Sequence, residues 1–385
     1  MDRVRELLKK NTMIIALLVV SLFFTLQTGG TLLVPQNVTN LIAQNGYVVV
    51  LAVGMLMCIL TGGNIDLSVG SVVALIGALA GTLIVNKGMN MWLAIAICLA
   101  VGIIIGIIQG FWIAYLRIPA FIVTLAGMLL WRGVALMILG GLTVSPFPDK
   151  YLNLFNSYLP DVFGGSINIL SIVIGLVICM IYIAIQVISR MNKRKKGYEL
   201  ASITAVIVRI VIISVVIMAL AFSLSNHKGV PTILIMLAVV VMIYGYFTTK
   251  TVPGRYLYAM GGNEKASKLS GINTNKVLFL AYVNMAFLSA VAALICVARF
   301  NSAAPTAGTN YEMDAIGACY IGGASAYGGT GTVGGVVIGA IFMGVINNGM
   351  SIMGIDNNLQ KVIKGIVLLA AVTFDVLSKK RSRTA

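Results

Sequence analysis

The feature that most constrains this chain is a series of long apolar runs that follow one another along almost its whole length. Most contain about 20 residues of Leu, Ile, Val, Ala and Gly, without alternation of apolar and polar positions. A helix of that length crosses the hydrocarbon core of a bilayer, whereas membrane barrel strands are shorter and alternate. The runs therefore predict spanning helices rather than strands.

We count twelve candidate spans: 13–26, 41–61, 67–85, 92–115, 119–139, 169–188, 203–224, 231–248, 277–298, 315–326, 333–350 and 362–377. The first resembles a signal peptide, but no small-residue cleavage site follows, so we interpret it as an uncleaved span. The run at 315–326 is too short to cross unless the glycine-rich stretch after it contributes. The prediction is one all-α polytopic domain over 1–385, a bundle of about 10–12 transmembrane segments with glycine-broken or re-entrant helices.

Composition and charge placement fit a membrane protein. Hydrophobic residues make up 59% of the chain and charged residues only 10%, too few to cover a soluble globule. The formal net charge of +16 would raise the question of nucleic acid in a soluble protein. Here most basic residues fall between spans or at the chain ends, where the lipid bilayer is the partner. Loops rich in Lys and Arg stay cytoplasmic, so both termini are expected inside. The clusters are Arg3, Arg5, Lys9 and Lys10; Arg190, Lys193, Arg194, Lys195 and Lys196; the segment 250–276; and Lys379, Lys380, Arg381 and Arg383.

A polar, glycine-rich stretch interrupts the apolar sequence at LTGGNIDLSVGS, residues 60–71. It contains Asn64, Ser68 and Asp66, the only acidic residue between Glu6 and Asp149. A second stretch, CYIGGASAYGGTGTVGGVVIGAIFMGVINNGMS at 319–351, also passes from Gly-Gly and a polar residue into a glycine-spaced apolar helix. Paired interruptions of this kind indicate a transport pathway, although chance similarity is the alternative. Asp66 is then either a helix N-cap, the interpretation we favour, or a wall residue of the pathway.

Asn64 and Ser68 are further candidates for the walls of a translocation path, together with other polar residues inside apolar runs. Arg132 lies near mid-depth in LLWRGVALM, where a bare guanidinium is costly, so it should face the bundle interior or water. Amides that suit a neutral, hydroxyl-rich substrate are Gln44, Asn45, Asn284, Asn347 and Asn348. The alternative for all of them is a structural bond between helices, and we favour it for the amides and for Arg132.

The loop KTVPGRYLYAMGGNEKASKLSGINTNK, residues 250–276, has a local pattern that the other basic loops lack. Gly261, Gly262 and Asn263 predict a turn, residues 264–269 a short amphipathic helix, and Gly271 its end. A short surface helix of this kind needs a partner surface or the lipid headgroups. A simple connecting loop would not need it.

Residue types for chemistry within this chain are scarce. No G-x-x-x-x-G-K-[ST] pattern occurs, so any dependence on ATP must come from a partner. The carboxylates Asp66, Asp314 and Asp375 lie near span ends, which argues against a proton relay and an ion-coupled carrier. The five cysteines fall inside apolar runs and the single histidine in a short loop. We therefore expect no catalytic residues, no metal site and no cofactor in this chain.

Four motifs together resemble a known family: TGGNIDLSVGS, IPAFIVTLAGMLLWRG, GRYLYAMGGNEKASKLSGIN and IGGASAYGGTGTVGGVVIGA. They are similar, in the same order, to the permease subunit of bacterial ABC sugar importers of the ribose, xylose and galactoside branch. The resemblance covers 37–377. The basic loop and extra helices at 190–249 resemble an insertion of the longer xylose or multiple-sugar type.

The resemblance implies partners and a mechanism. Two permease copies would sit on two cytoplasmic ATPases, and an extracytoplasmic binding protein would deliver a monosaccharide for import across the inner membrane by alternating access. Segment 250–276 would contain the coupling helix that docks on the ATPase. The positions carried over to that contact are Gly262, Asn263, Glu264, Ala266, Leu269, Ser270 and Gly271.

Two other function classes remain as alternatives at the level of sequence. An ion-coupled secondary sugar carrier also has twelve spans and basic inner loops, and it would take up substrate from an ion gradient alone. An intramembrane enzyme would need a catalytic dyad at depth, which the sequence does not offer. Co-purification with a subunit that hydrolyses ATP discriminates among the three.

Overall fold

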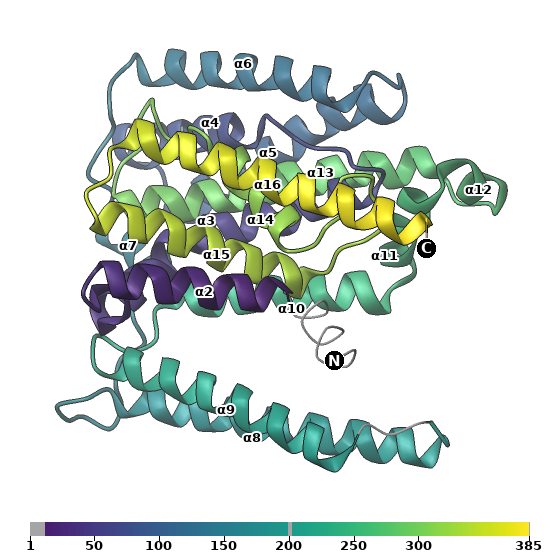
Figure 1. Ribbon diagram of the computed structural model, residues 1–385. Helices are drawn as coiled ribbons and strands as arrows, with labels where there is room; N and C mark the ends of the chain where they lie inside the picture. The colour runs from purple at the N-terminus through teal and green to yellow at the C-terminus, as the bar shows by residue number, and fades with distance from the viewer. Residues whose placement is uncertain (1–11, 199–201, 385) are drawn as a thin grey trace. The chain divides into compact units, whose positions relative to one another are not determined.

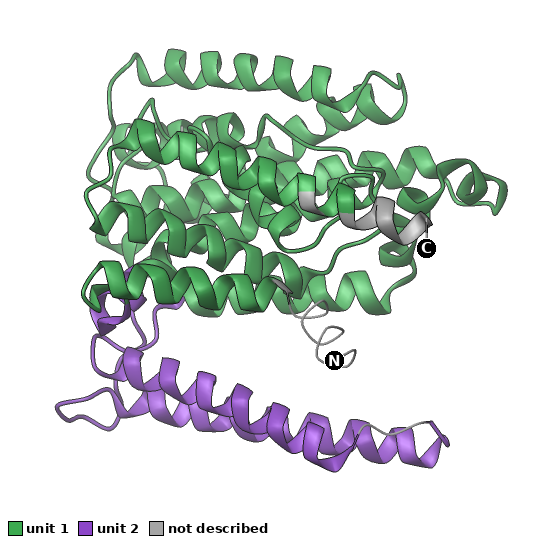
Figure 2. Cartoon of the chain, viewed as in Figure 1, with its two compact units in different colours: residues 1–32, 41–156, 233–385 green, residues 33–40, 157–232 purple. Residues whose placement is uncertain are grey.

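The computed structural model describes residues 12–198 and 202–384, and within them the chain divides into two compact units. Figure 2 colours them: unit 1 contains 1–32, 41–156 and 233–385, and unit 2 contains 33–40 and 157–232. The predicted N-terminal basic cluster at Arg3 to Lys10 lies outside the described residues. The predicted insertion at 190–249 has residues in both units, because its last helix belongs to unit 1.

Unit 1 is built from helices (Figure 1). In chain order they are α2 (Thr12–Gln27), η1 (Thr31–Leu33), which ends in unit 2, α3 (Pro35–Leu60), which begins there, α4 (Val69–Gly81) with the π-helical turn η2 (Thr82–Asn86), α5 (Met91–Ala114), α6 (Ala120–Leu139), α7 (Asp149–Phe155), α10 (Thr232–Lys250), α11 (Val252–Gly262), α12 (Glu264–Leu269), α13 (Thr274–Phe300), α14 (Tyr311–Ile321), α15 (Val333–Ile352) and α16 (Asn357–Thr384).

Unit 2 is mainly a hairpin of two long helices, α8 (Ile169–Lys195) and α9 (Ile203–Ser225). They approach closely where Gly175 faces Ala221, since a side chain at Gly175 would collide with the Ala221 methyl group. Asn168 caps α8 by accepting a hydrogen bond from the Ser171 amide at 2.9 Å. Most side chains of both helices are exposed and apolar, as expected for helices that face lipid.

Nine helices of the described residues are long and apolar enough to cross a bilayer: α3, α4 with η2, α5, α6, α8, α9, α10, α13 and α15. The all-α polytopic prediction is confirmed. Three expected spans are not among these nine: α2 has 16 residues, α16 has 28 but carries several charges, and α14 has only 11. At 1.5 Å per residue α14 is about 16 Å long, roughly half the hydrocarbon core. It is therefore a short helix, as the sequence predicted.

Four spans form the buried centre of unit 1, namely α3, α4, α13 and α15. Close packing on α13 comes from a glycine ladder on α5. Gly102 faces Ala286 and Ala290 of α13, and Gly106 reaches the α13 backbone one turn further on. Spacing of four residues places these glycines on one face, where the absence of side chains lets the backbones approach. This packing is the main contact that fixes α5 against α13.

Glycines also join α14 to α15. A side chain at Gly335 would collide with the Gly322 carbonyl oxygen, and one at Gly339 with the Ala318 carbonyl oxygen. The glycine-spaced sequence at 319–351 therefore serves close helix approach. The helices are also broken at 322–332, where the chain leaves α14 and turns into α15, as expected for the predicted glycine-broken helices.

A buried ion pair connects α14 to α16. The Lys364 ammonium nitrogen lies 2.9 Å from Asp314 Oδ1, and the Tyr47 hydroxyl donates to Asp314 Oδ2 at 3.4 Å. The Asp314 side chain is 3% exposed. Asp314 does lie in the first turn of its helix, but that helix is inside unit 1, so the carboxylate is shielded from solvent rather than lying at an open span end.

Removing the lysine should destabilise unit 1. We expect Lys364→Met to cost about 3 kcal/mol of stability, because it leaves the Asp314 charge buried and unpaired. The matched control is Lys361→Met, an exposed lysine on the same helix, which should change little. Thermal unfolding of the two variants in detergent measures the difference, and equal midpoints would show that the pair does not stabilise the fold.

Candidate functional site

The segment that joins α10 to α13 contains two consecutive short helices. Thr251 caps α11 by accepting a hydrogen bond from the Gly254 amide at 3.1 Å, and Pro253 fits the first turn, where no amide donor is needed. Asn263 then ends α11, and its side chain accepts from the Ala266 amide at 3.0 Å to cap α12. The predicted turn at 261–263 is therefore wrong in extent. Gly261 and Gly262 are helical, and only Asn263 breaks the helix.

Helix α12 spans Glu264–Leu269, as the sequence predicted. Gly271 follows with a φ of +85°, a left-handed conformation that ends the helix without steric cost. Ser267 points into the protein, whereas Lys265, Ala266 and Lys268 are exposed. Leu269 is 90% exposed. Figure 1 shows α12 projecting from one end of unit 1, so this short helix presents an apolar side chain to its surroundings.

The C-terminal end of α11 packs directly on two glycine-rich loops. A side chain at Gly261 would collide with the Leu60 carbonyl oxygen at the end of α3 and with the Gly329 backbone. The Gly329 amide donates to the Leu60 carbonyl oxygen at 3.1 Å, and the Tyr258 hydroxyl of α11 donates to the Gly331 carbonyl oxygen at 2.9 Å. Helix α11 is thereby attached to the end of α3 and to the loop after α14.

The two glycine-rich stretches of the sequence meet each other at this place. A side chain at Gly63 would collide with the Ala326 carbonyl oxygen, and one at Gly328 with the Gly62 backbone. Both loops use positive φ at these glycines, which only residues without a side chain adopt readily. The sequence suggested that the stretches are related, and the structure places them in contact beneath α11.

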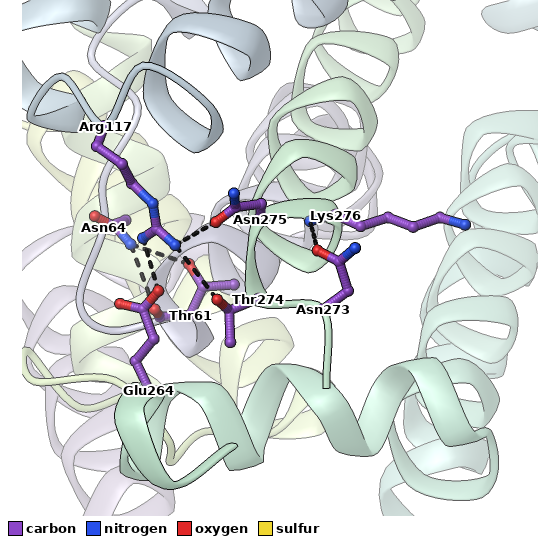
Figure 3. A network of polar contacts seen from close by, with 8 residues as sticks. All are labelled: Thr61, Asn64, Arg117, Glu264, Asn273, Thr274, Asn275 and Lys276. Carbon is purple, nitrogen blue, oxygen red and sulfur yellow. Dashed lines mark hydrogen bonds and ion pairs between the residues drawn. The ribbon is translucent and has the colours of Figure 1, made fainter. Parts of the chain in front are cut away.

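Arg117, in the loop between α5 and α6, ties α12 to its neighbours (Figure 3). Its guanidinium donates to Glu264 Oε1 at 2.6 Å, to the Thr274 hydroxyl at 3.3 Å, and to the Asn275 side-chain oxygen. The Arg117 and Glu264 side chains are each 42% exposed, and ion pairs with such exposure contribute about 0.2–1 kcal/mol. Arg117 has a φ of +57°, which costs on the order of 1 kcal/mol for a residue with a side chain.

Sequence reasoning missed Arg117. The available signal was its isolation, since it is the only charged residue between Lys87 and Arg132 and stands directly before the Ile-Pro that opens α6. Sequence reasoning also assigned Glu264 to the ATPase contact alone. In the structure this carboxylate has a partner within the chain.

The predicted path residues on α3 and α15 come together. Asn348 donates to the Gln44 side-chain oxygen at 3.2 Å, and Asn45 donates to the Leu41 carbonyl oxygen at 2.9 Å and packs against Gly344. The side-chain oxygen of Asn347 is buried without a hydrogen-bond partner among the described atoms. The bond from Asn348 to Gln44 joins two helices, which fits the structural role that we favour for these amides.

Asp66 and Ser68 form a second group at the start of α4. Asp66 Oδ1 accepts from the Ser68 amide at 2.8 Å and from the Ser68 hydroxyl at 2.6 Å, and the Gln109 amide donates to the Ser68 hydroxyl at 3.0 Å. The N-cap residue is Ser68, so the prediction that Asp66 is the N-cap is wrong by two positions. Burial raises the pKa of Asp66 to about 6, although the hydrogen bonds from Ser68 lower it. Asn64, in the same turn, donates to the carbonyl oxygen and the hydroxyl oxygen of Thr61.

The remaining two candidates lie elsewhere. Arg132 donates to the carbonyl oxygens of Pro305 and Ala307, in the loop before α14. Asn284 of α13 accepts from the Tyr244 hydroxyl of α10. The predicted path residues are thus distributed over separate contacts, and the structure does not bring them into one site.

Comparison with known proteins identifies the family. Residues 37–372 match the family described as the branched-chain amino acid transport system / permease component. The chain belongs to this family. No solved structure matches it at a significant level.

Curated relatives of this permease match it over nearly its whole length. The xylose transport system permease protein XylH of Escherichia coli is 38% identical over 370 residues, 96% of this chain and 92% of that protein. XylH of Haemophilus influenzae is 37% identical over 369 residues, 96% of each. The ribose import permease protein RbsC of E. coli is 34% identical over 370 residues, 96% of this chain and 94% of that protein.

These matches confirm the predicted resemblance and favour a transport permease over an ion-coupled carrier. Together with the nine apolar spans they identify the chain as a multi-pass membrane permease. They do not assign functional residues, so the docking and path residues stay predictions.

Two helical glycines, Gly261 on α11 and Gly365 on α16, give a matched test of the site. We expect Gly261→Ala to reduce transport at least about tenfold, because the added carbon must displace the Leu60 and Gly329 backbones. Gly365→Ala should be tolerated, since no atom lies within 4 Å of the added carbon. Uptake by cells with equal amounts of each variant in the membrane compares them. Equal loss in both would contradict the packing that we describe.

Proposed function

We propose that this permease is the membrane subunit of an ATP-driven importer and that α12 docks on a separate cytoplasmic ATPase. The observation that carries the proposal is the projecting α12 with Leu269 90% exposed at its end. An apolar side chain in that position gains free energy when a partner covers it. Of the residues carried over from the family resemblance, Gly262, Asn263, Ala266, Leu269, Ser270 and Gly271 are exposed, and Glu264 is partly exposed.

Charge placement supports a cytoplasmic position for α12. The segment around it carries Lys250, Arg255, Lys265, Lys268 and Lys276, and basic loops are retained on the cytoplasmic side. The same rule puts the basic end of α8 and both chain termini inside. In this orientation the permease lies in the inner membrane with α12 accessible to a cytoplasmic protein.

Energy for transport would come from the partner. The sequence has no phosphate-binding loop, so this chain is not expected to hydrolyse ATP or to hold a cofactor. The names of the relatives describe permease proteins of transport and import systems, which fits a chain that works with other subunits. We propose that an extracytoplasmic binding protein delivers the substrate, and that docked ATPases switch the permease between outward-open and inward-open states.

A second copy of the permease would complete the pathway. Most of the predicted path residues form hydrogen bonds within one chain, and α5, α6 and α10 expose much apolar surface. Pairing of two copies would cover part of that surface and place the pathway between them. The mass of the purified membrane complex tests this homodimer.

We propose a monosaccharide as substrate, with a pentose such as xylose first and ribose second. The xylose and ribose permeases each align over 96% of this chain, and the xylose relatives have the higher identity. Branched-chain amino acids, named in the family description, are the competing class. Uptake of labelled xylose, ribose and leucine by cells that express the complete system decides between them. Leucine uptake without pentose uptake would contradict the proposal.

Docking can be tested at Leu269. We expect Leu269→Asp to lower ATPase co-purification at least about tenfold and to abolish ATP-dependent uptake, because a charge replaces the apolar contact. The matched control is Leu142→Asp, which is also highly exposed but lies in the loop after α6. It should keep both properties. If Leu269→Asp co-purifies with the ATPase as well as the wild type does, α12 is not the docking element.

A further inference from the structure

We propose that Arg117 is the positioning residue that transmits displacement of α12 to the spans α5, α6 and α13. The proposal rests on the proposed docking function of α12. It assigns to Arg117 a role that the sequence did not suggest, and it changes the role of Glu264 from an ATPase contact to an internal partner of Arg117.

The geometry places one guanidinium between three parts of the permease. Arg117 itself lies where α5 ends and α6 begins. Its acceptors are Glu264 in the first turn of α12, and Thr274 and Asn275 in the first turn of α13. Figure 3 shows the three side chains converging on the guanidinium. A shift of α12 therefore acts on α13 and on the junction of α5 and α6 through one side chain.

The backbone conformation at position 117 is unfavourable for arginine, so a role of the arginine side chain must explain why this residue occurs there. Three non-glycine residues of the described chain have positive φ: Arg117, Asn301 and Asn310. Asparagine adopts this conformation readily, whereas arginine does not. A glycine or asparagine would fit the loop with less strain. Strain retained at one position points to a function of the side chain.

The exposure of the Arg117–Glu264 ion pair fits a contact that breaks and re-forms during transport. Both side chains are accessible to water, so the pair is screened and contributes little to folding. The other ion pair found among the described residues, Lys364 with Asp314, is buried and far less able to exchange with solvent. Loss of Arg117 should therefore affect transport more than stability.

The planar fork of arginine matters for this role. It gives several donors in fixed directions, so Glu264, Thr274 and Asn275 are engaged at once. A lysine in the same place would keep the charge but offers a single ammonium group on a flexible chain. We expect Arg117→Lys to transport at an intermediate rate.

The experiment uses the complete complex of permease, ATPase and binding protein in vesicles. The variants are Arg117→Gly, which relieves the backbone strain and removes the guanidinium, and the exchange Arg117→Glu with Glu264→Arg, which reverses the pair. Arg255→Ala is the matched control, since Arg255 is an exposed arginine on α11 outside the network. Three quantities are measured: ATPase co-purification, ATP hydrolysis, and substrate transported per ATP hydrolysed.

We expect Arg117→Gly to retain the ATPase within about twofold of the wild type while substrate transported per ATP falls about tenfold. The exchanged pair should recover at least about a third of the wild-type ratio, and Arg255→Ala should keep all of it. An unchanged ratio in Arg117→Gly would overturn the inference, and so would loss of the ATPase from that variant, because Arg117 would then serve docking itself. Failure of the wild type to bind an ATPase would instead refute the proposed function, and the inference with it.

Discussion

The hydrogen bond from the Gly329 amide to the Leu60 carbonyl oxygen is the interaction on which this permease most depends. Where helices end inside a packed protein, backbone groups lose their helical partners, so the segments that follow must supply others. Here the Gly329 amide bonds the last carbonyl oxygen of α3, and the loops at 61–68 and 322–332 pack together through glycines that leave no side chain between them. Helix α11 then packs on this joint through Gly261, and its position fixes the direction in which α12 projects.

The contacts at the centre of unit 1 are buried, whereas those at its periphery are exposed to water. The centre is held by glycine ladders and by the buried pair of Lys364 and Asp314. The periphery is held by Arg117, whose pair with Glu264 is open to water and weak. The proposed docking function needs both properties, because α12 would follow a partner while the spans keep their backbone bonds.

The sequence predicted what local chemistry determines. Hydropathy predicted the spans, because lipid imposes length and composition on each of them separately. The bounds of α12 followed from an Asn cap before it and a glycine after it, both within a few residues. The turn at 261–263 was wrong because two glycines in sequence favour a turn, whereas close packing on Leu60 and Gly329 needs glycine within a helix.

What the sequence could not predict depends on contacts between distant residues. Arg117 and Glu264, like Asp314 and Lys364, are paired only by the fold, and no local pattern relates their positions. The polar residues assigned to a path had the correct environment but not a common location. Asn348 bonds Gln44, Ser68 bonds Gln109, and Arg132 bonds a loop, so their polarity stabilises separate contacts. Polarity in an apolar run alone does not distinguish these roles.

The most direct test of the account is cross-linking from position 269. All five native cysteines are buried, so Leu269→Cys introduces an exposed thiol that a short bifunctional reagent can select. In the assembled transporter we predict a cross-link from this thiol to the ATPase subunit, and none from Leu142→Cys. A cross-link from position 142, or an accessible thiol at 269 that never reaches the ATPase, would contradict the claim that α12 is the docking element.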